Sequence, residues 1–251
     1  MDIIRNGLWP MLGSGTAAMI RFEDGGWWLP DGEEHLQQWM LTVNKRFKDR
    51  LTYQYHKYEM ALRWARPAWQ VAVDVGAHVG LWSWPMSHDF GAVVAVEPMS
   101  AHRECYLRNM DGRPNFTLHG VALGETDGTA FLRTRTPGSS GDTGVDQAAE
   151  RSSLRASVDT DGELVDMKRL DDFDLKNVTL LKIDCEGYEL FVLRGAVETL
   201  KRCKPCVIVE QKPETGMEQR YGIGTTDAVK FLEGLGAVKR AGIQGDYILS
   251  W

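Results

Sequence analysis

The sequence predicts a doubly wound α/β domain, with a mostly parallel sheet, an antiparallel edge strand and an N-terminal cap. Two observations lead to this prediction. From residue 71 onward, short apolar runs alternate with helical stretches, a pattern typical of parallel strands joined by right-handed helical crossovers. Acidic residues and glycines follow directly after several of these runs, where the carboxyl ends of parallel strands border a ligand crevice.

The elements follow in a regular order along the chain. The cap is predicted to hold a hairpin over 16–30 and helical segments over 33–65. In the main domain, strands are predicted over 71–75, 92–96, 116–123, 178–183 and 207–210, and helices over 100–110, 188–201 and 226–235. The closing antiparallel strands are 237–239 and 246–251. We therefore divide the chain into a cap, 1–66, and a main domain, 67–251.

One interval, 134–161, lacks a strand or helix pattern and is rich in glycine, serine and threonine. A loop of this length in a compact domain is usually functional or disordered. We interpret it as a candidate lid, with a disordered surface segment as the equal alternative. Arg135, Arg151 and Arg155 give it a basic character that would suit an anionic small molecule.

Composition excludes several classes of protein. The 251 residues include 29 basic and 35 acidic side chains, so the net charge is −6 and the basic footprint of a nucleic-acid binder is missing. No apolar run near the start is long enough to span a membrane, and none follows the positively charged segment that begins a secretion signal. Four cysteines are too few for a disulfide framework. We expect a cytoplasmic protein without membrane contact.

The first main-domain strand ends in a glycine loop with the spacing D-x-G-x-x-x-G, formed by Asp74, Gly76 and Gly80. Glycines at such a turn let the backbone approach a ligand closely. His78 stands where a dinucleotide fingerprint has its second glycine, which disfavours a nicotinamide cofactor. The second strand ends at Glu97, 21 residues after Gly76. A carboxylate there is placed to accept hydrogen bonds from the ribose hydroxyls of an adenosine.

More carboxylates follow the fourth and fifth predicted strands. Asp184 and Glu186 come directly after the fourth strand, and Glu210 ends the fifth. The carboxyl ends of neighbouring parallel strands meet at one edge of the sheet, so these groups are candidates for a functional site. Glu189 is expected in the first turn of the next helix, where the helix dipole favours negative charge.

Together these motifs resemble the FkbM family of S-adenosylmethionine-dependent methyltransferases. The resemblance covers residues 71–211 and is carried by D-x-G-x-x-x-G at 74–80, V-E-P at 96–98, A-L-G at 122–124, L-D-D at 170–172, L-K-I-D-C-E-G-Y-E at 181–189, L-x-G-A at 193–196 and P-x-V-I-V-E at 205–210. The chain departs from the family at His78, where asparagine is more usual, and at Pro85 inside the helix that follows.

The resemblance implies a Rossmann-like class I methyltransferase fold and O-methylation of a hydroxyl on a sugar, polyketide or other small metabolite. It implies that Glu97 binds the ribose, that Asp74 helps to hold the methionine portion, and that Val121 and Ala122 lie near the adenine. The cofactor-binding residues implied in this way are Asp74, Gly76, Ala77, His78, Gly80, Glu97, Pro98, Val121, Ala122 and Asp184. Asp184 and Glu186 are implied to face the sulfonium and the acceptor.

Three assignments for deprotonating the acceptor hydroxyl stay open at this point. Asp184 is our hypothesis for the base or orienting group, with Glu186 beside it. Alternatively, Asp184 and Glu210 hold a divalent cation such as Mg²⁺ that lowers the pKa of the hydroxyl. A histidine, His78 or His88, is the third alternative.

Other functions remain as alternatives to this prediction. They are a non-catalytic adenosine-ligand binding subunit, a nicotinamide-dependent oxidoreductase and a nucleic-acid methyltransferase. The acidic net charge disfavours the last. The expected partner is a small-molecule acceptor, a sugar or an anion, and a homo-oligomer is compatible with the sequence.

Overall fold

The computed structural model describes residues 3–5, 18–65, 70–146 and 162–251. The predicted boundary between cap and main domain, at 66–67, lies outside these residues. No helix in the described part of the chain is both long and apolar enough to cross a lipid bilayer.

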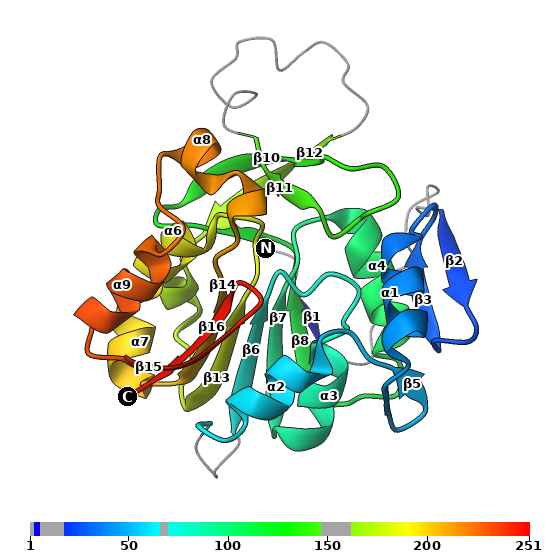
Figure 1. Cartoon of the computed structure of the whole chain (residues 1–251), viewed down its shortest axis with the longest axis horizontal. Helices are drawn as coiled ribbons and strands as arrows, with labels where there is room; N and C mark the ends of the chain where they lie inside the picture. The colour runs from blue at the N-terminus through cyan, green and yellow to red at the C-terminus, as the bar shows by residue number, and fades with distance from the viewer. Residues whose placement is uncertain (1–2, 6–17, 66–69, 147–161) are drawn as a thin grey trace.

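A central sheet of eight strands organises the described residues (Figure 1). Its order is β1 (Ile3–Arg5), β8 (Phe116–His119), β7 (Ala92–Val96), β6 (Val71–Val75), β13 (Val178–Ile183), β14 (Cys206–Glu210), β16 (Asp246–Ser250) and β15 (Val238–Ile243). The five strands from β8 to β14 run parallel, whereas β1 at one edge and the β16–β15 pair at the other are antiparallel. The predicted doubly wound, mostly parallel fold with an antiparallel edge is confirmed.

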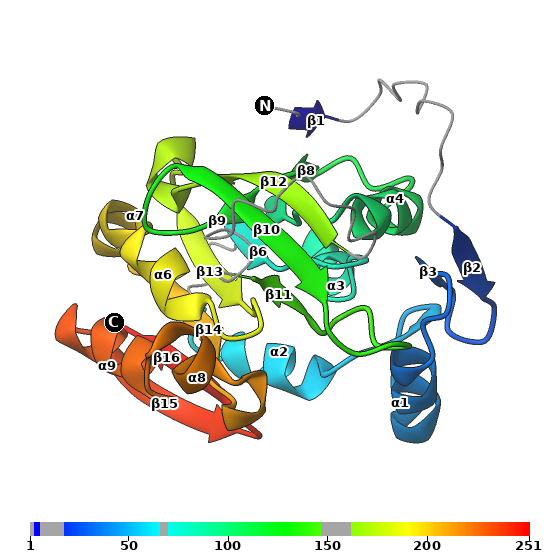
Figure 2. The same cartoon turned by 90° about the horizontal axis from the view of Figure 1, so that it is seen from above.

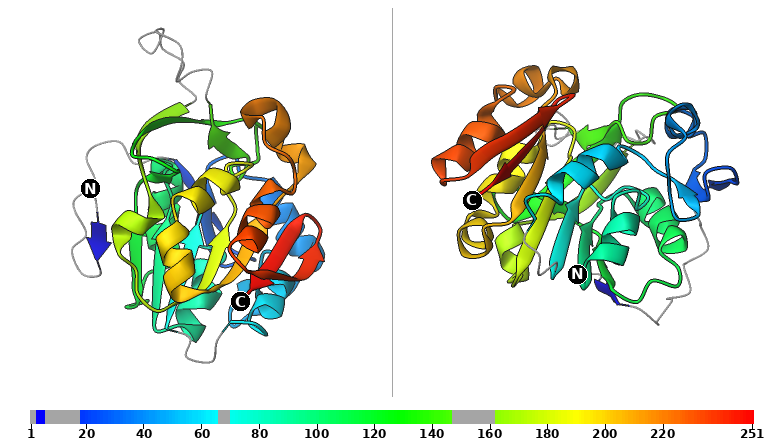
Figure 3. Two further views of the ribbon diagram at one scale, coloured as in Figure 1. Left: turned by 90° about the vertical axis from the view of Figure 1, so that its left-hand side faces the viewer. Right: turned by 60° about the horizontal axis from the view of Figure 1, so that its bottom comes forward.

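Helices cover both faces of this sheet because its central strands are apolar on both sides. In β14, Cys206 and Ile208 belong to one core, while Val207 and Val209 belong to the other. The first core packs under α3 (Ser83–Asp89) and α4 (Ser100–Asn109). The second packs under α6 (Glu189–Arg194), α7 (Val197–Cys203) and α9 (Asp227–Gly234), the yellow and orange helices in front of the strands in the left panel of Figure 3.

Two predicted elements are divided in the structure. The helix predicted over 188–201 is two helices that meet at Gly195, where a Cβ atom would lie 2.0 Å from the carbonyl oxygen of Gly124. Only glycine allows this close approach, because any side chain would clash with the Gly124 carbonyl. The strand predicted over 116–123 ends at His119, and its last residues join a different sheet. Pro85 is tolerated because it lies in the first turn of α3, where its missing N–H has no partner.

A second sheet of four strands lies over the carboxyl ends of the central strands (Figures 1 and 2). Its order is β11 (Thr143–Val145), β10 (Gly128–Thr134), β12 (Gly162–Lys168) and β9 (Ala122–Leu123). The candidate lid, 134–161, is therefore only partly a loop. Residues 135–142 connect β10 to β11, and 147–161, with Arg151 and Arg155, lie outside the described residues. The shorter elements nearby are the 3₁₀ turns Leu170–Phe173 and Pro213–Thr215 and the helix α8 (Met217–Tyr221).

The cap keeps its predicted hairpin but is less helical than predicted. The hairpin is β2 (Met19–Phe22) with β3 (Trp27–Pro30). The segment predicted as helical contains α1 (His35–Val43), the short pair β4 (Arg46–Phe47) and β5 (Arg50–Leu51), and α2 (Tyr55–Ala61). Asn44 and Lys48 adopt left-handed φ values of 48° and 53°, which end α1 and turn the chain. Residues 3–5, assigned to the cap, belong instead to the central sheet.

The cap shares the core of the main domain. Trp27, Leu29, Met40 and Tyr58 are almost fully buried in the same apolar cluster as residues of α3 and α4. The cap is thereby fixed beside the carboxyl ends of the central strands.

Candidate functional site

A cavity of about 390 Å³ opens at the carboxyl ends of β6, β7, β13 and β14. It is lined by most of the predicted site residues: Gly76, Ala77, His78, Glu97, Pro98, Val121, Ala122, Asp184, Glu186 and Glu210. Of the predicted set, Asp74 and Gly80 do not line it. Its volume is in the range of small-molecule sites, and it extends from the glycine loop to the acidic strand ends.

The glycine loop packs directly against the end of β13. Gly76 has a φ of 70°, and a Cβ atom there would lie 1.9 Å from the carbonyl oxygen of Asp184. Any other residue would push apart the two segments that carry the site. His78 also has a positive φ, 50°, which disfavours most side chains but not asparagine, the residue more usual in the family.

Glu97 is held as an ionised carboxylate at the end of the cavity beside the glycine loop. Its side chain is 4% exposed, its Oε2 accepts a hydrogen bond from the backbone N–H of His78 at 2.8 Å, and its Oε1 accepts one from Met99 at 2.9 Å. His102 Nδ1 lies 3.1 Å from Oε1. Burial alone would raise the pKa of Glu97, but His102 and these hydrogen bonds lower it to about 2.

Asp74 lies behind the cavity instead of lining it. It is fully buried, accepts a hydrogen bond from Ser83 Oγ at 2.7 Å and lies 3.3 Å from Lys182 Nζ. Lys182 in turn donates to the carbonyl oxygen of Gly76 at 2.7 Å. The structure gives Asp74 a supporting position under the glycine loop, and its predicted contact with a methionine group stays a prediction.

Sequence reasoning missed Lys182, although a signal was present. The residue is a lysine within the otherwise apolar strand β13, and a buried charge needs a partner. Burial lowers the pKa of Lys182, but Asp74 and Asp184 outweigh that effect and raise it, so the ammonium stays charged.

Three carboxylates meet at the other end of the cavity. One carboxylate oxygen from each of Asp184, Glu186 and Glu210 lies within 4.8 Å of the other two. Burial and the neighbouring Asp184 raise the pKa of Glu186 to about 7, and the same two causes raise that of Glu210 well above its usual value. For Asp184, burial is outweighed by Lys182 and Lys212, and its pKa is lowered.

The turn that carries two of these carboxylates is fixed by Glu189. As predicted, Glu189 begins the next helix, and its Oε1 accepts hydrogen bonds from the backbone N–H groups of Cys185 at 2.9 Å and Gly187 at 3.0 Å. The side chain is fully buried, so the turn cannot open without exposing these bonds.

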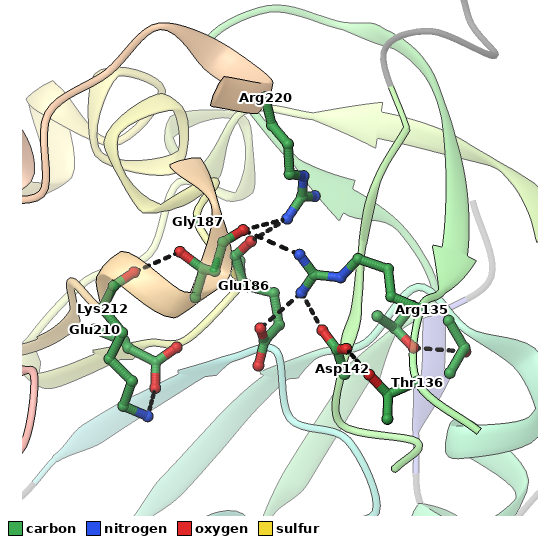
Figure 4. Close-up of polar contacts among 12 residues, drawn as sticks. Arg135, Thr136, Asp142, Glu186, Gly187, Glu210, Lys212 and Arg220 are labelled. Carbon is green, nitrogen blue, oxygen red and sulfur yellow. Dashed lines mark hydrogen bonds and ion pairs between the residues drawn. The ribbon is translucent and has the colours of Figure 1, made fainter. Parts of the chain in front are cut away.

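Basic side chains surround the acidic end (Figure 4). Lys212 donates to Glu210 Oε1, and Arg135 Nη2 donates to Glu186 Oε2 at 2.8 Å. Arg135 also pairs with Asp142, and Arg220 donates to the backbone carbonyl of Glu186 at 2.9 Å. Arg135 and Arg220 lie 51 and 34 positions from Glu186, so no local pattern indicated these contacts, whereas Lys212 is only two residues from Glu210.

The cap and the loop 135–142 also contribute to the cavity. His35 and Tyr53 of the cap line it. Buried Glu33 accepts hydrogen bonds from the N–H and the Oγ of Ser140, whose Oγ lies 2.8 Å from His78 Nε2. A chain of polar contacts thus joins the cap, the loop and the glycine loop.

Only one of the two histidines considered as a base reaches the cavity. His88 Nδ1 lies 2.9 Å from the carbonyl oxygen of Trp84, and the residue does not line the cavity. His78 does, but burial and the neighbouring His102 lower its pKa to about 3. Its Nε2 is also engaged with Ser140 Oγ at 2.8 Å, whereas three carboxylates lie together at the other end of the cavity and are better placed to accept a proton.

The chain is similar in sequence to known methyltransferases. The family model of the methyltransferase FkbM domain matches residues 74–237. "Methyltransferase 1" of Beauveria bassiana (strain ARSEF 2860) is 31% identical over 141 residues, which cover 49% of this chain and 57% of that protein. The aligned region is thus less than two thirds of that relative's length.

Two solved structures are similar to this chain at low identity. Methyltransferase FkbM from Methylobacillus flagellatus KT is 17% identical, with a TM-score of 0.47 over 74% of this chain and 44% of that chain. Precorrin-6y C5,15-methyltransferase from Geobacter metallireducens GS-15 is 15% identical, with a TM-score of 0.47 over 82% and 92%. Because the family model spans well over half of the sequence and includes both ends of the cavity, the chain belongs to the FkbM methyltransferase family.

Proposed function

We propose that the protein transfers a methyl group from S-adenosylmethionine to a hydroxyl of a sugar or another small hydroxylated metabolite. One observation carries the proposal. A single cavity joins a buried, ionised carboxylate suited to a ribose, Glu97, to the carboxylates Asp184 and Glu186 at the opposite end. Methyl transfer requires the methyl donor and the acceptor to be held next to each other, and therefore in one cavity.

The residues at the cofactor end fit an adenosine. Glu97 can accept hydrogen bonds from both ribose hydroxyls, because each of its oxygens retains acceptor capacity. Val121 and Ala122 offer an apolar surface to the base. The Gly76 turn leaves room for the part of the cofactor that joins the ribose to the sulfonium. The carboxylates at the acidic end favour the positive charge of that sulfonium.

The acidic end supplies the groups that O-methylation requires. S-adenosylmethionine, held by Glu97, Val121 and Ala122, would supply an electrophilic methyl group and would leave as S-adenosylhomocysteine. Asp184, directly after β13 and against the glycine loop, accepts the hydroxyl proton and later releases it to water. Glu186 orients the hydroxyl from the neighbouring position.

The contacts of Arg135 favour a neutral, hydroxylated acceptor over an anion at this end. Its guanidinium is paired with both Glu186 and Asp142. An acceptor anion would have to displace one of these carboxylates. The hydroxyls of a sugar can instead donate to them, and Tyr53 lines the same cavity. The cytoplasmic location and a homo-oligomeric state stay predictions.

Calorimetry with S-adenosylhomocysteine, run beside NAD, tests the cofactor assignment. We expect micromolar binding of the first ligand only. Glu97→Ala should weaken it at least about 100-fold, because two hydrogen bonds to a charged group contribute about 1.5–3 kcal/mol each. Glu198→Ala, on the exposed face of α7, is the control and should bind normally. Binding of NAD alone would overturn the proposal.

A panel of sugars and hydroxylated metabolites, assayed with methyl-labelled S-adenosylmethionine, tests the acceptor assignment. The expected product carries the label in an ether linkage that resists mild acid and base. Label found only on amines or carbon would refute O-methylation while leaving the cofactor assignment intact.

A further inference from the structure

The acidic end of the cavity contains a buried carboxylate oxygen without a hydrogen-bond partner among the described residues. Glu210 is only 2% exposed, and its Oε2 has no hydrogen-bond partner within the described part of the chain. In Figure 4 the Glu210 oxygen that Lys212 does not bind is turned toward the carboxylate of Glu186. A buried carboxylate oxygen without a partner is costly, so its position between other carboxylates calls for a positive ligand.

The basic side chains hold the carboxylates from the outside. Lys212 bonds one oxygen of Glu210, and Arg135 bonds one oxygen of Glu186. Lys182 lies 4.0 Å from one oxygen of Asp184. Metal-binding carboxylates are commonly supported in this way by hydrogen bonds to their outer oxygens, which fix the inner ones.

We propose that Asp184, Glu186 and Glu210 form a binding site for one divalent cation of the Mg²⁺ or Mn²⁺ type. Hard cations of this kind prefer carboxylate oxygens at 2.0–2.1 Å in octahedral geometry, which places ligand oxygens at most about 4.2 Å apart. The observed oxygens, within 4.8 Å of one another, reach this spacing with shifts of less than about 1 Å.

The cation would deepen the function proposed above, on which this role rests. Three protein oxygens leave three octahedral positions for water or for acceptor oxygens. All three carboxylates line the cavity, so an acceptor hydroxyl can reach the remaining positions. A coordinated hydroxyl loses its proton more easily, which assists its transfer to a carboxylate and then to water. The methyl transfer step itself is unchanged.

The competing occupant is a proton shared between Asp184 and Glu210. It would neutralise one negative charge without any metal ion. The two occupants are distinguished by direct measurement of metal binding, which does not depend on an acceptor or on turnover.

The experiment uses the full chain, treated with EDTA and dialysed, and titrates it with Mn²⁺ while electron paramagnetic resonance monitors the free ion. Titrations run with and without S-adenosylhomocysteine. We expect one bound Mn²⁺ per chain, displaced by excess Mg²⁺. Glu210→Gln and Asp184→Asn should each weaken Mn²⁺ binding at least tenfold. Glu214→Gln removes an exposed carboxylate at the rim of the same cavity and should bind Mn²⁺ normally.

Each outcome decides between the proposals. Failure to bind millimolar Mn²⁺ in a chain that binds S-adenosylhomocysteine overturns the cation site but not the methyltransferase. Mn²⁺ binding that neither Glu210→Gln nor Asp184→Asn weakens places the ion elsewhere and also overturns it. A chain that binds Mn²⁺ at this site but does not bind S-adenosylhomocysteine supports the cation site and overturns the proposed function. Thermal unfolding of each variant shows whether a loss of binding reflects a loss of fold.

Discussion

Glu97 and Glu210 are two buried carboxylates at the ends of strands in one sheet, yet their environments are opposite. Glu97 receives two backbone hydrogen bonds and lies against His102, and its pKa falls to about 2. Glu210 keeps one oxygen without a partner among the described residues, and burial and Asp184 raise its pKa well above the usual value. The Glu97 carboxylate is therefore satisfied by partners within the protein, whereas the Glu210 carboxylate keeps an oxygen without one among the described residues.

Of the variants considered, Asp184→Asn, at the acidic end of the cavity, should have the largest effect on turnover. Without a carboxylate to accept the hydroxyl proton, turnover should fall about 10²- to 10⁴-fold. The affinity for S-adenosylhomocysteine should change less than about threefold, because that ligand has no sulfonium charge. Glu97→Ala should show the reverse pattern. A fall in turnover of less than tenfold would assign the proton to another group.

Lys182→Met tests the support under the cofactor end. The change leaves Asp74, which is fully buried, with Ser83 as its remaining partner. Breaking a buried ion pair in this way should lower the free energy of unfolding by about 3–5 kcal/mol, measured by urea denaturation. The double variant Lys182→Met/Asp74→Asn should regain part of it. A loss below about 1 kcal/mol in the single variant would contradict this role of the pair.

The sequence predicted the central sheet and most of the cavity because both follow from local pattern. Apolar runs placed β6, β7, β13 and β14, and the residues directly after them had to meet at one edge. Other contacts had no such signal. Arg135 reaches Glu186 across 51 positions, and Ser140 reaches Glu33 across 107. Tertiary packing alone decides these pairs.

Local sequence patterns also did not reveal the second sheet or the short hairpin of the cap. β9 has two residues, and β11 has three, too few for an alternating pattern to register. The hairpin at 46–51 depends on left-handed Asn44 and Lys48, which a helical spacing of apolar residues does not reveal. Lys182 is the exception, because a lysine inside an apolar strand was visible and its meaning was missed.

The pH dependence of the free energy of unfolding in His78→Asn tests the environment of this ring beside Glu97. Burial and His102 lower the pKa of His78 to about 3, against 6.5 in an unfolded chain, so folding favours the neutral ring. The contribution of His78 to stability is complete above pH 6.5 and falls as the pH drops toward 3. At pH 5 the loss is at most about 2 kcal/mol. The free energy of unfolding should therefore fall less in the variant between pH 7 and pH 5; equal falls would contradict the shift.

Ser140→Ala should have the smallest effect, because it removes only the side-chain part of the contact between the two loops and the cap. The Oγ of Ser140 bonds Glu33 and lies 2.8 Å from His78 Nε2, but its N–H still donates to Glu33 at 2.6 Å. We expect about fivefold weaker binding of S-adenosylhomocysteine, equivalent to about 1 kcal/mol for one net hydrogen bond, with faster dissociation.

Ser139→Ala is the matched control, since this neighbour lines the cavity, which Ser140 does not, and the variant should bind the ligand normally. Equal effects of the two variants would show that the loop acts only by covering the cavity. A loss above tenfold in Ser140→Ala alone would mean that its hydroxyl contacts the ligand. The loop and the cap, as well as the strand ends, would then contact the ligand near Glu97. The Glu97 end of the cavity would also depend on a ligand for some of its contacts, and would differ less from the Glu210 end.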